Sequence, residues 1–326
     1  YIMIFGKFPP VSGKRGSNNM KHQNAWLFNL MLIGTAFLWG VSFLWVKDAL
    51  NAGLDSGFFL FLRYLLASLI WLPFCGKEVK KLTFRQVLMG LTVGFFLYAA
   101  MLVQTIALGM TTPSNSAFIT TSYVVLTPFV VWALLRQKPQ KKIYACAALC
   151  FLGLYVLTRV PGESFSLSFG DGLTLVSALL FALQMTFLYR FSSQLPSKVL
   201  TFLPQATTCV LSFITALVTG KVTFQGVDVK AALIPTLLVV FLATLAAGYF
   251  QTVGQKNVEP SRCAIIFSLE SVFACIASVV MGYEPLTTNL VAGGVIIVTS
   301  IIISELPSKE DRRQARLVKQ MRQEEK

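Results

Sequence analysis

A short polar motif occurs twice in this chain in the same order. Gln-Thr, Pro-Ser and Ala follow one another over residues 104–117, and again over residues 251–264, 147 positions later. Five hydrophobic segments separate the copies, and an odd number of crossings reverses the direction of a chain through a bilayer. A duplicated half with inverted topology is typical of secondary transporters, whose two halves rock about one central site.

The composition predicts an all-α integral membrane protein. Hydrophobic residues fill 55% of 326 positions, only 13% are charged, and the mean hydropathy is +0.67. A soluble domain of this size cannot bury so much apolar surface. The apolar residues form blocks close to the ~20 residues that span a bilayer core. We expect ten transmembrane helices, at residues 25–46, 57–75, 86–107, 114–135, 143–158, 172–189, 199–219, 231–255, 263–283 and 287–304.

The net charge of +14 reports orientation in the membrane, not a nucleic-acid partner. If the N-terminus is cytoplasmic, 23 of the 28 basic residues fall in cytoplasmic segments, while Lys47, Arg159, Lys221 and Lys230 lie outside and Arg63 within a span. This asymmetry is the positive-inside rule. It predicts a multi-pass protein of the plasma membrane, of the bacterial inner-membrane type, with both termini in the cytoplasm and the lipid bilayer as its surroundings.

The spans divide the chain into two repeats with flanking segments. We expect a disordered cytoplasmic segment at residues 1–24, a first repeat at 25–158, an external linker at 159–171, a second repeat at 172–304 and a basic cytoplasmic tail at 305–326. Tyr1 is not an initiator, and Met20-Lys21 resembles a natural beginning, so residues 1–19 are interpreted as disordered or extraneous. The first span is too long for a signal peptide.

Several motifs together resemble a known transporter family. They are Arg63-Tyr64-Leu65-Leu66-Ala67, Gln104-Thr105, the Tyr-Val-Val-Leu-Thr-Pro run at 123–128, and the segments 266–274 and 282–287. They are similar to motifs of the EamA family in the drug/metabolite transporter superfamily. The resemblance covers residues 25–305 and implies ten helices, as two inverted five-helix repeats around a central cavity, moving amino acids, metabolites or other small solutes. Where the family has Leu-Glu-Pro-Val, this chain has Leu269-Glu270-Ser271-Val272, so a proline-dependent kink there is in question.

Glu270 is the one acidic residue inside an expected span, near the middle of the ninth. A carboxylate in the bilayer costs at least a few kcal/mol, so it usually faces a cavity or a partner. It is a candidate for proton coupling or gating, for binding a cationic group of the substrate, or for a structural anchor.

Arg63 is the basic residue well inside a span, roughly 9 Å from the outer end of the second at 1.5 Å per residue. Its stem can snorkel to the interface. Alternatively it lines the cavity, holds a substrate carboxylate through its planar fork, or pairs with Glu270, which is the arrangement we expect.

Further polar and aromatic residues fall where the family has its cavity. At an offset of 142 residues Arg63 aligns with Gln205 and Trp39 with Phe181. Hydroxyl and amide groups in membrane helices often serve only packing, which is the alternative for about half of the set. With Glu270 and Arg63, the candidates for substrate binding or gating are Gln104, Gln251, Asn115, Tyr123, Ser268 and Trp39.

No catalytic residues, metal site or cofactor are expected. The six cysteines lie in or beside spans without a CxxC, the one histidine precedes the first span, and structural zinc needs four closely spaced ligands. We therefore expect a secondary transporter that moves a small metabolite, amino-acid-like or otherwise polar or amphipathic, out of the cell by alternating access, with protons as the possible coupling ion. The alternatives are a channel-like or facilitative permease and an intramembrane enzyme.

Overall fold

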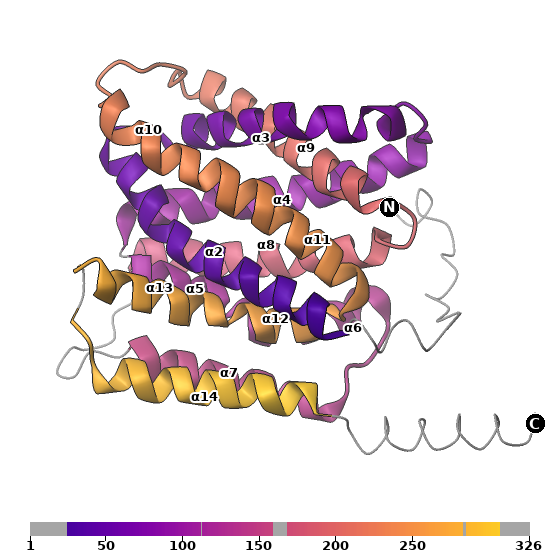
Figure 1. Ribbon diagram of the computed structural model, residues 1–326, viewed down its shortest axis with the longest axis vertical. Helices are drawn as coiled ribbons and strands as arrows, with labels where there is room; N and C mark the ends of the chain where they lie inside the picture. The colour runs from indigo at the N-terminus through magenta and orange to yellow at the C-terminus, as the bar shows by residue number, and fades with distance from the viewer. Residues whose placement is uncertain (1–24, 112, 159–167, 283–284, 307–326) are drawn as a thin grey trace, which may run out of the picture.

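The computed structural model describes residues 25–111, 113–158, 168–282 and 285–306, and each regular element in these ranges is a helix (Figure 1). The expected segments 1–24 and 159–167 and the tail from 307 lie outside the described residues. In chain order the helices are α2 (Ala25–Asn51), α3 (Ser56–Val79), α4 (Phe84–Met110), α5 (Pro113–Thr121), α6 (Tyr123–Leu135), α7 (Lys141–Thr158), α8 (Phe169–Phe191), α9 (Ser197–Val218), α10 (Val229–Leu238), η1 (Val239–Ala246), α11 (Ala247–Asn257), α12 (Pro260–Phe267), α13 (Leu269–Val280) and α14 (Thr288–Glu305).

Eight helical segments are long and apolar enough to cross a membrane, so this is a multi-pass membrane fold. Large apolar side chains such as Phe95, Phe129 and Phe241 are half exposed on the outside of the bundle, as lipid contact requires. The expected spans 143–158 and 287–304 lie in α7 and α14, which are not among the eight, although α14 contains the shorter apolar helix Val291–Ser304. The eight segments are Trp26–Asn51, Ser56–Val79, Phe84–Met110, Ser116–Leu135, Phe169–Phe191, Ser197–Val218, Val229–Asn257 and Pro260–Val280.

One end of the bundle, here the Asp55 end, joins the loops after α2, α4 and α9. Lys47 donates to the carbonyls of Leu108 (2.8 Å) and Thr111 (3.1 Å). The Asp228 amide donates to the Ala52 carbonyl at 2.9 Å, and Lys221 pairs with Asp55 at 3.1 Å.

The opposite end, here the Lys138 end, joins the loops after α3, α6, α8 and α11. Gln86, in the first turn of α4, donates to the Gln194 carbonyl at 3.1 Å and so ties the start of α4 to the loop after α8. Helix α2 ends at the Asp55 end. Helix α8 begins at that same end, as shown by the hydrogen bond from Thr111 to Asp171 in the first turn of α8 (3.2 Å). Helices α2 and α8 therefore run in opposite directions.

Two long helical segments, here called rods, are each interrupted near the middle by a serine: one consists of α5 and α6, the other of α12 and α13. The two serines are 146 residues apart. Ser122 separates α5 from α6, and its amide bonds the Ile119 carbonyl three residues back at 3.1 Å. Ser268 separates α12 from α13 in the same way, with its amide shared between the carbonyls of Ala264 and Ile265. The expected ninth span is thus interrupted without the proline that the family pattern places at residue 271.

A third rod contains the π-helix η1, which the sequence did not predict. Its Thr244 hydroxyl donates to the Val239 carbonyl five residues back at 2.9 Å. Pro235, one turn before η1, lacks an N–H for the helical ladder. Because π segments are rare and frequently occur at functional sites, η1 marks this part of the bundle for attention.

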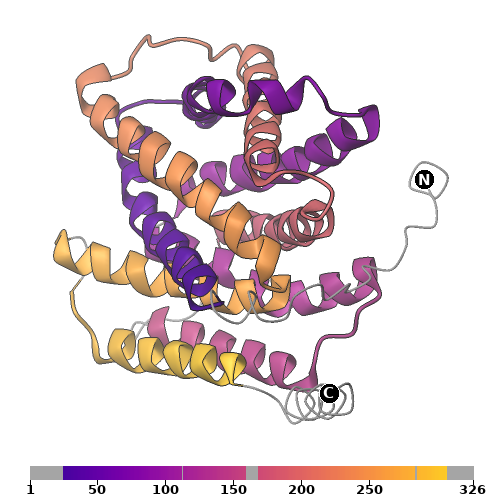
Figure 2. The same cartoon turned by 45° about the vertical axis from the view of Figure 1, so that its right-hand side comes forward.

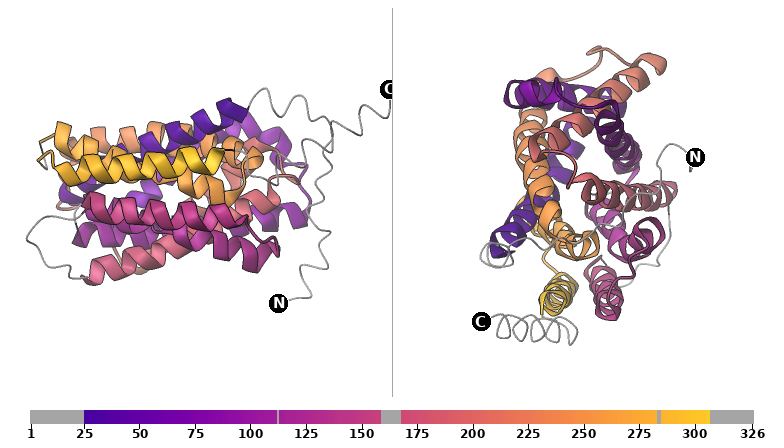
Figure 3. Two further views of the ribbon diagram at one scale, coloured as in Figure 1. Left: turned by 90° about the horizontal axis from the view of Figure 1, so that it is seen from below. Right: turned by 90° about the vertical axis from the view of Figure 1, so that its right-hand side faces the viewer.

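Small residues allow the rods to approach closely. A Cβ added at Gly90 would lie 2.4 Å from Leu203, and one at Gly94 would lie 2.4 Å from Thr207. These two glycines, four residues apart in α4, therefore let α4 pack closely against α9. Helices α7 and α14 lie side by side at one edge of the bundle (Figures 2 and 3).

Candidate functional site

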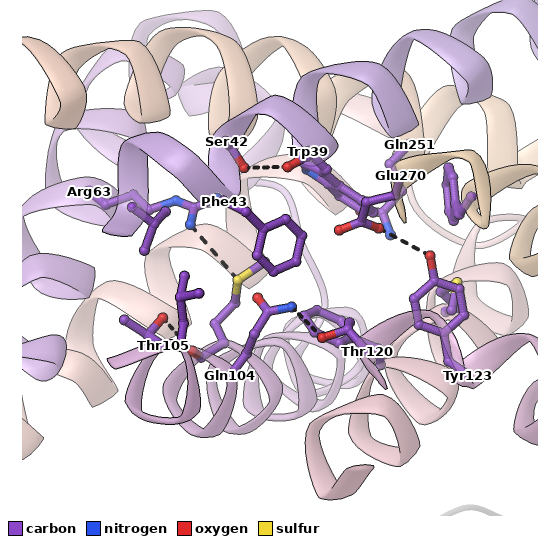
Figure 4. A pocket seen from close by; sticks show the side chains of 16 residues that line it. Trp39, Ser42, Phe43, Arg63, Gln104, Thr105, Thr120, Tyr123, Gln251 and Glu270 are labelled. Atoms are coloured by element: carbon purple, nitrogen blue, oxygen red, sulfur yellow. Dashed lines mark hydrogen bonds between the residues drawn. The ribbon is translucent and has the colours of Figure 1, made fainter. Parts of the chain in front are cut away.

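A cavity lies in the centre of the bundle, between the two interrupted helices and α2, α3, α4, α8 and α11 (Figure 4). A mostly apolar, concave wall with a few converging polar side chains is typical of sites for small molecules. One part of its wall is apolar, and the polar side chains are few and come from different helices. The lining residues are Trp39, Ser42, Phe43, Val46, Arg63, Met101, Gln104, Thr105, Leu108, Thr120, Tyr123, Phe181, Met185, Gln251, Phe267 and Glu270.

The two interrupted rods place Tyr123 and Glu270 in this cavity. Tyr123 is the first residue of α6 and Glu270 the second of α13, immediately after the interruptions. The Tyr123 hydroxyl donates to Oε2 of Glu270 at 3.2 Å, and both side chains are buried. Glu270 is 4% exposed, and this bond supplies part of the polar contact that a buried carboxylate needs.

Arg63 lies on the other side of the cavity, with Phe43 between it and Glu270 in Figure 4. Only 4% of Arg63 is exposed, so it does not snorkel to the interface. Its Nε donates to the Thr244 hydroxyl in η1 at 2.6 Å, and Nη1 approaches the Met101 sulfur at 4.0 Å. The guanidinium also lies 5.2 Å from the centre of the Tyr64 ring.

The expected ion pair between Arg63 and Glu270 is wrong for this conformation. Within the described part of the chain the recorded salt bridge joins Lys221 and Asp55 at the bundle end. Arg63 instead contacts η1, while Glu270 contacts Tyr123. The two buried groups of opposite charge thus belong to one cavity without neutralising one another by direct contact.

The glutamines of the repeated motif, Gln104 and Gln251, both line the cavity. Gln104 donates to the Thr120 hydroxyl at 3.0 Å, whereas Gln251 donates to the Gln184 side-chain carbonyl at 3.3 Å. Equivalent positions of the repeat therefore reach the same cavity but hold different partners.

Trp39 also lines the cavity and is fixed by a hydrogen bond from its indole N–H to the Ala243 carbonyl in η1, at 3.0 Å. Its ring lies 5.3 Å from that of Phe267, tilted by 51°. Phe181, which the sequence aligned with Trp39, lines the same cavity.

Two of the candidates are not placed in the cavity. Ser268 is fully buried, and its hydroxyl donates to the Ile265 carbonyl of its own rod. It therefore serves the interruption of the helix and not the cavity wall. Asn115 belongs to α5, but its side chain lies outside the described residues.

A second cavity lies nearer the Lys138 end and was not predicted. It is lined by residues that include Gln184, Leu188, Thr201, Gln205 and Thr244. Four residues line both cavities and so form the wall between them: Trp39, Arg63, Met101 and Gln251. Thr244 escaped sequence reasoning because it sits in an apolar run whose π geometry leaves no mark in the sequence.

In the described part of the chain, no three His, Cys, Asp or Glu side chains gather where they could hold a metal ion. The six cysteines are buried and unpaired with one another, as expected for thiols that act as small apolar residues.

Comparisons with known proteins place this architecture. The model of the EamA-like transporter family matches twice, at residues 26–159 and 168–306. An uncharacterised transporter of Archaeoglobus fulgidus is 30% identical over 279 residues, which cover 85% of each chain. One crystal structure aligns with a TM-score of 0.70 at 17% identity, covering 90% of this chain and 99% of that one, and so shows a shared fold.

The fold, the cavity and these matches define a multi-pass membrane transporter of small solutes. The chain belongs to the EamA-like transporter family, which is part of the drug/metabolite transporter superfamily.

Proposed function

We propose that this protein is a secondary transporter that exports a small solute by alternating access, without chemical change to the solute. The proposal rests on one observation. Residues related by the repeat meet in a single cavity: Gln104 with Gln251, and Tyr123 with Glu270, each pair 147 positions apart. Two halves that share one central site can expose it first to one side and then to the other.

The proposed architecture is ten membrane helices in two inverted repeats of five, at residues 25–158 and 172–304. Helix α3 packs on its counterpart α9, and α7 packs on its counterpart α14. The packing of α4 on α8 is matched by that of α11 on α2. This pattern supports a pseudo-twofold relation, and α7 and α14 complete the ten.

We place the Lys138 end in the cytoplasm. Among the described residues, twelve basic side chains lie near that end, whereas Lys47, Lys221 and Lys230 lie near the other. The positive-inside rule then gives N-in/C-in topology in a plasma membrane of the bacterial inner-membrane type. Segment 159–171 is the external linker, and residues 1–24 and 305–326 are cytoplasmic.

Glu270 is the proposed coupling or gating group, with the proton as coupling ion. Its carboxylate accepts a hydrogen bond from Tyr123 and so connects the two interrupted helices. Protonation of Glu270 removes the negative charge that strengthens this hydrogen bond. A change of protonation can therefore alter the contact between the two repeats. The remaining cavity candidates, Gln104, Gln251, Trp39 and Arg63, are proposed to contact the solute; Asn115 is kept as a candidate of the same kind.

The test is counterflow in proteoliposomes. Vesicles loaded with an unlabelled candidate solute should accumulate the same labelled solute from outside, with no ATP present. Amino acids, purine-like metabolites and quaternary amines form the first panel. A loss of accumulation in Gln104→Leu and Gln251→Leu, but not in the exposed loop variant Gln225→Leu, would support transport through this cavity. Solute flux that shows no exchange, and that saturates at no concentration, would indicate a channel instead.

A further inference from the structure

Arg63 occupies an unusual place, because it lines the wall between the central cavity and the second cavity. The other wall residues, Trp39, Met101 and Gln251, carry no charge. Glu270 lines the central cavity but not the second one. Within the described part of the chain, Arg63 is thus the one charged side chain that both cavities share.

The charge of Arg63 has no carboxylate to balance it in this conformation. Its recorded hydrogen bonds use Nε, toward Thr244, and Nη1, toward the Met101 thioether at 4.0 Å. A guanidinium has five N–H donors in a planar fork, and a thioether is a weak acceptor. The outer edge of the fork therefore lacks a strong acceptor, although an unpaired buried charge is costly.

The stem of Arg63 is held in place by the π-helix. The Thr244 hydroxyl accepts from Arg63 and itself donates to the Val239 carbonyl. The Thr244 carbonyl accepts from Gln205 at 3.2 Å, and Gln205 is the residue that the repeat aligns with Arg63. Bound on its Nε side, the guanidinium can offer its two Nη groups to a ligand, the geometry that binds a carboxylate through two parallel hydrogen bonds.

Building on the proposed transport function, we propose that Arg63 binds a carboxylate group of the transported solute and that the solute reaches it from either cavity. A single guanidinium matches a monoanion. A phosphate dianion would demand further cations, and the described lining of the central cavity offers the acidic Glu270 instead. The apolar wall, with Phe43, Phe181 and Met185, suits the remainder of a small amphipathic solute.

The experiment compares carboxylates with their neutral amides. Purified protein in proteoliposomes is assayed by counterflow with the amino acids and short-chain monocarboxylates, each beside its primary amide; L-phenylalanine and L-phenylalaninamide are the first pair. Removing one partner of a buried charged contact commonly weakens binding by about 30-fold or more, so we expect carboxylates to compete at least that much better than amides.

The variants assign this preference to Arg63. Arg63→Gln places in the first repeat the side chain that Gln205 provides in the second, and it should remove the preference for carboxylates. Arg63→Lys keeps the charge but not the fork, and should retain part of it. Lys221→Gln removes a cation at the Asp55 end, far from the wall, and should leave the preference unchanged.

The outcomes separate the two proposals. If the wild-type protein exchanges amides or amines as efficiently as carboxylates, the proposed role of Arg63 is overturned, but the proposed transport function is not. Retention of the full carboxylate preference by Arg63→Gln would do the same. If no solute of any charge is exchanged, both proposals fail. Should Arg63→Gln not survive size-exclusion chromatography, the wild-type comparison of acids with amides still decides.

Discussion

The hydroxyl of Tyr123 donates to the carboxylate of Glu270 at 3.2 Å, and the two residues are separated by the same 147 positions that separate the copies of the motif. Repeat-related positions thus touch one another across the centre of the molecule. One position carries a carboxylate and the other a phenol, so the contact is complementary although the repeat is not identical.

The first prediction concerns that carboxylate. Glu270→Gln should abolish uptake driven by a pH gradient while counterflow at symmetric pH continues, because the amide keeps a hydrogen bond to Tyr123 but cannot exchange a proton. The measurement compares two rates in the same vesicles: solute uptake when the outside solution is more acidic than the lumen, and counterflow when the two pH values are equal.

Tyr123→Phe is the matched control, since it removes the hydrogen bond and leaves the proton-binding carboxylate. Weaker binding of cationic solutes at every pH by Glu270→Gln would instead assign recognition to Glu270. Wild-type transport by this variant under both conditions would leave Glu270 as an anchor only.

The second prediction tests the anchoring of Arg63. Thr244→Val keeps the shape of the side chain but removes the hydroxyl that contacts Nε at 2.6 Å. A hydrogen bond to a charged group contributes about 1.5–3 kcal/mol, so the apparent affinity of the transported solute should fall about 10- to 150-fold. Thr244→Ser keeps the hydroxyl and should stay within a few-fold of wild type; equal loss in both variants would speak for packing alone.

The third prediction concerns helix packing. Gly94→Ala and Gly90→Ala should each lower the stability of the protein by about 1–3 kcal/mol, the usual cost of overpacking. In each case the new methyl would lie 2.4 Å from α9. Gly76→Ala in α3 is the control, because nothing lies within 4 Å of its added Cβ. Thermal unfolding in detergent measures the difference, and equal midpoints for all three variants would contradict the close α4–α9 contact.

The fourth prediction is a pH dependence at the loop before α12. Burial raises the pKa of Glu259 above its ordinary value of 4.5, although Arg262 and Ser261 act in the opposite sense. The folded protein therefore holds this proton more tightly than the unfolded chain, so Glu259 opposes folding above its folded pKa. That effect is relieved as the pH falls toward 4.5.

Glu259→Gln should accordingly raise the unfolding midpoint at neutral pH and flatten its dependence on pH between 4.5 and 7. Glu305→Gln serves as the comparison for loss of one negative charge elsewhere in the chain. A midpoint lowered at neutral pH would show that Glu259 stabilises the start of α12 instead.

The fifth prediction is topology. In a cysteine-free background, Gln225→Cys should react with a membrane-impermeant maleimide added to intact cells, whereas Lys138→Cys should react only after permeabilisation. Both side chains are exposed and lie at opposite ends of the bundle. A reporter fused at Lys326 should be cytoplasmic, and an external tail would overturn the proposed orientation.

Hydropathy and the repeated motif were sufficient to predict the helical membrane fold and six of the residues that line its central cavity. Isolated polar residues in apolar helices must face a cavity or a partner, which is why Glu270, Arg63, Gln104, Gln251, Tyr123 and Trp39 all line the cavity. Their functional roles stay predictions.

The sequence could not predict which side chains of neighbouring helices contact one another. The expected Arg63–Glu270 pair was wrong because both residues prefer contacts that depend on local backbone form, Thr244 in the π-helix and Tyr123 after an interruption. Ser268 was misplaced for a related reason, since its hydroxyl bonds the Ile265 carbonyl of its own rod. The π-helix itself, Val-Val-Phe-Leu-Ala-Thr-Leu-Ala, is an apolar run that reads as ordinary α-helix.

The unequal partners of Gln104 and Gln251 have a consequence for the opposite state of the transporter. If the proposed repeats exchange conformations, Gln104 must take up the relation to α2 that Gln251 now has to α8. At the offset of 142 residues, the α2 counterpart of Gln184 is Ser42, which already lines the central cavity. Gln104 would then exchange its hydrogen bond with Thr120 for one with Ser42. Gln251 would leave Gln184 and move toward Phe267, which lies 147 residues after Thr120 and is its counterpart. The opposite state would thus hold one fewer polar contact of this kind, so in the absence of solute the resting equilibrium would be biased toward the arrangement seen here.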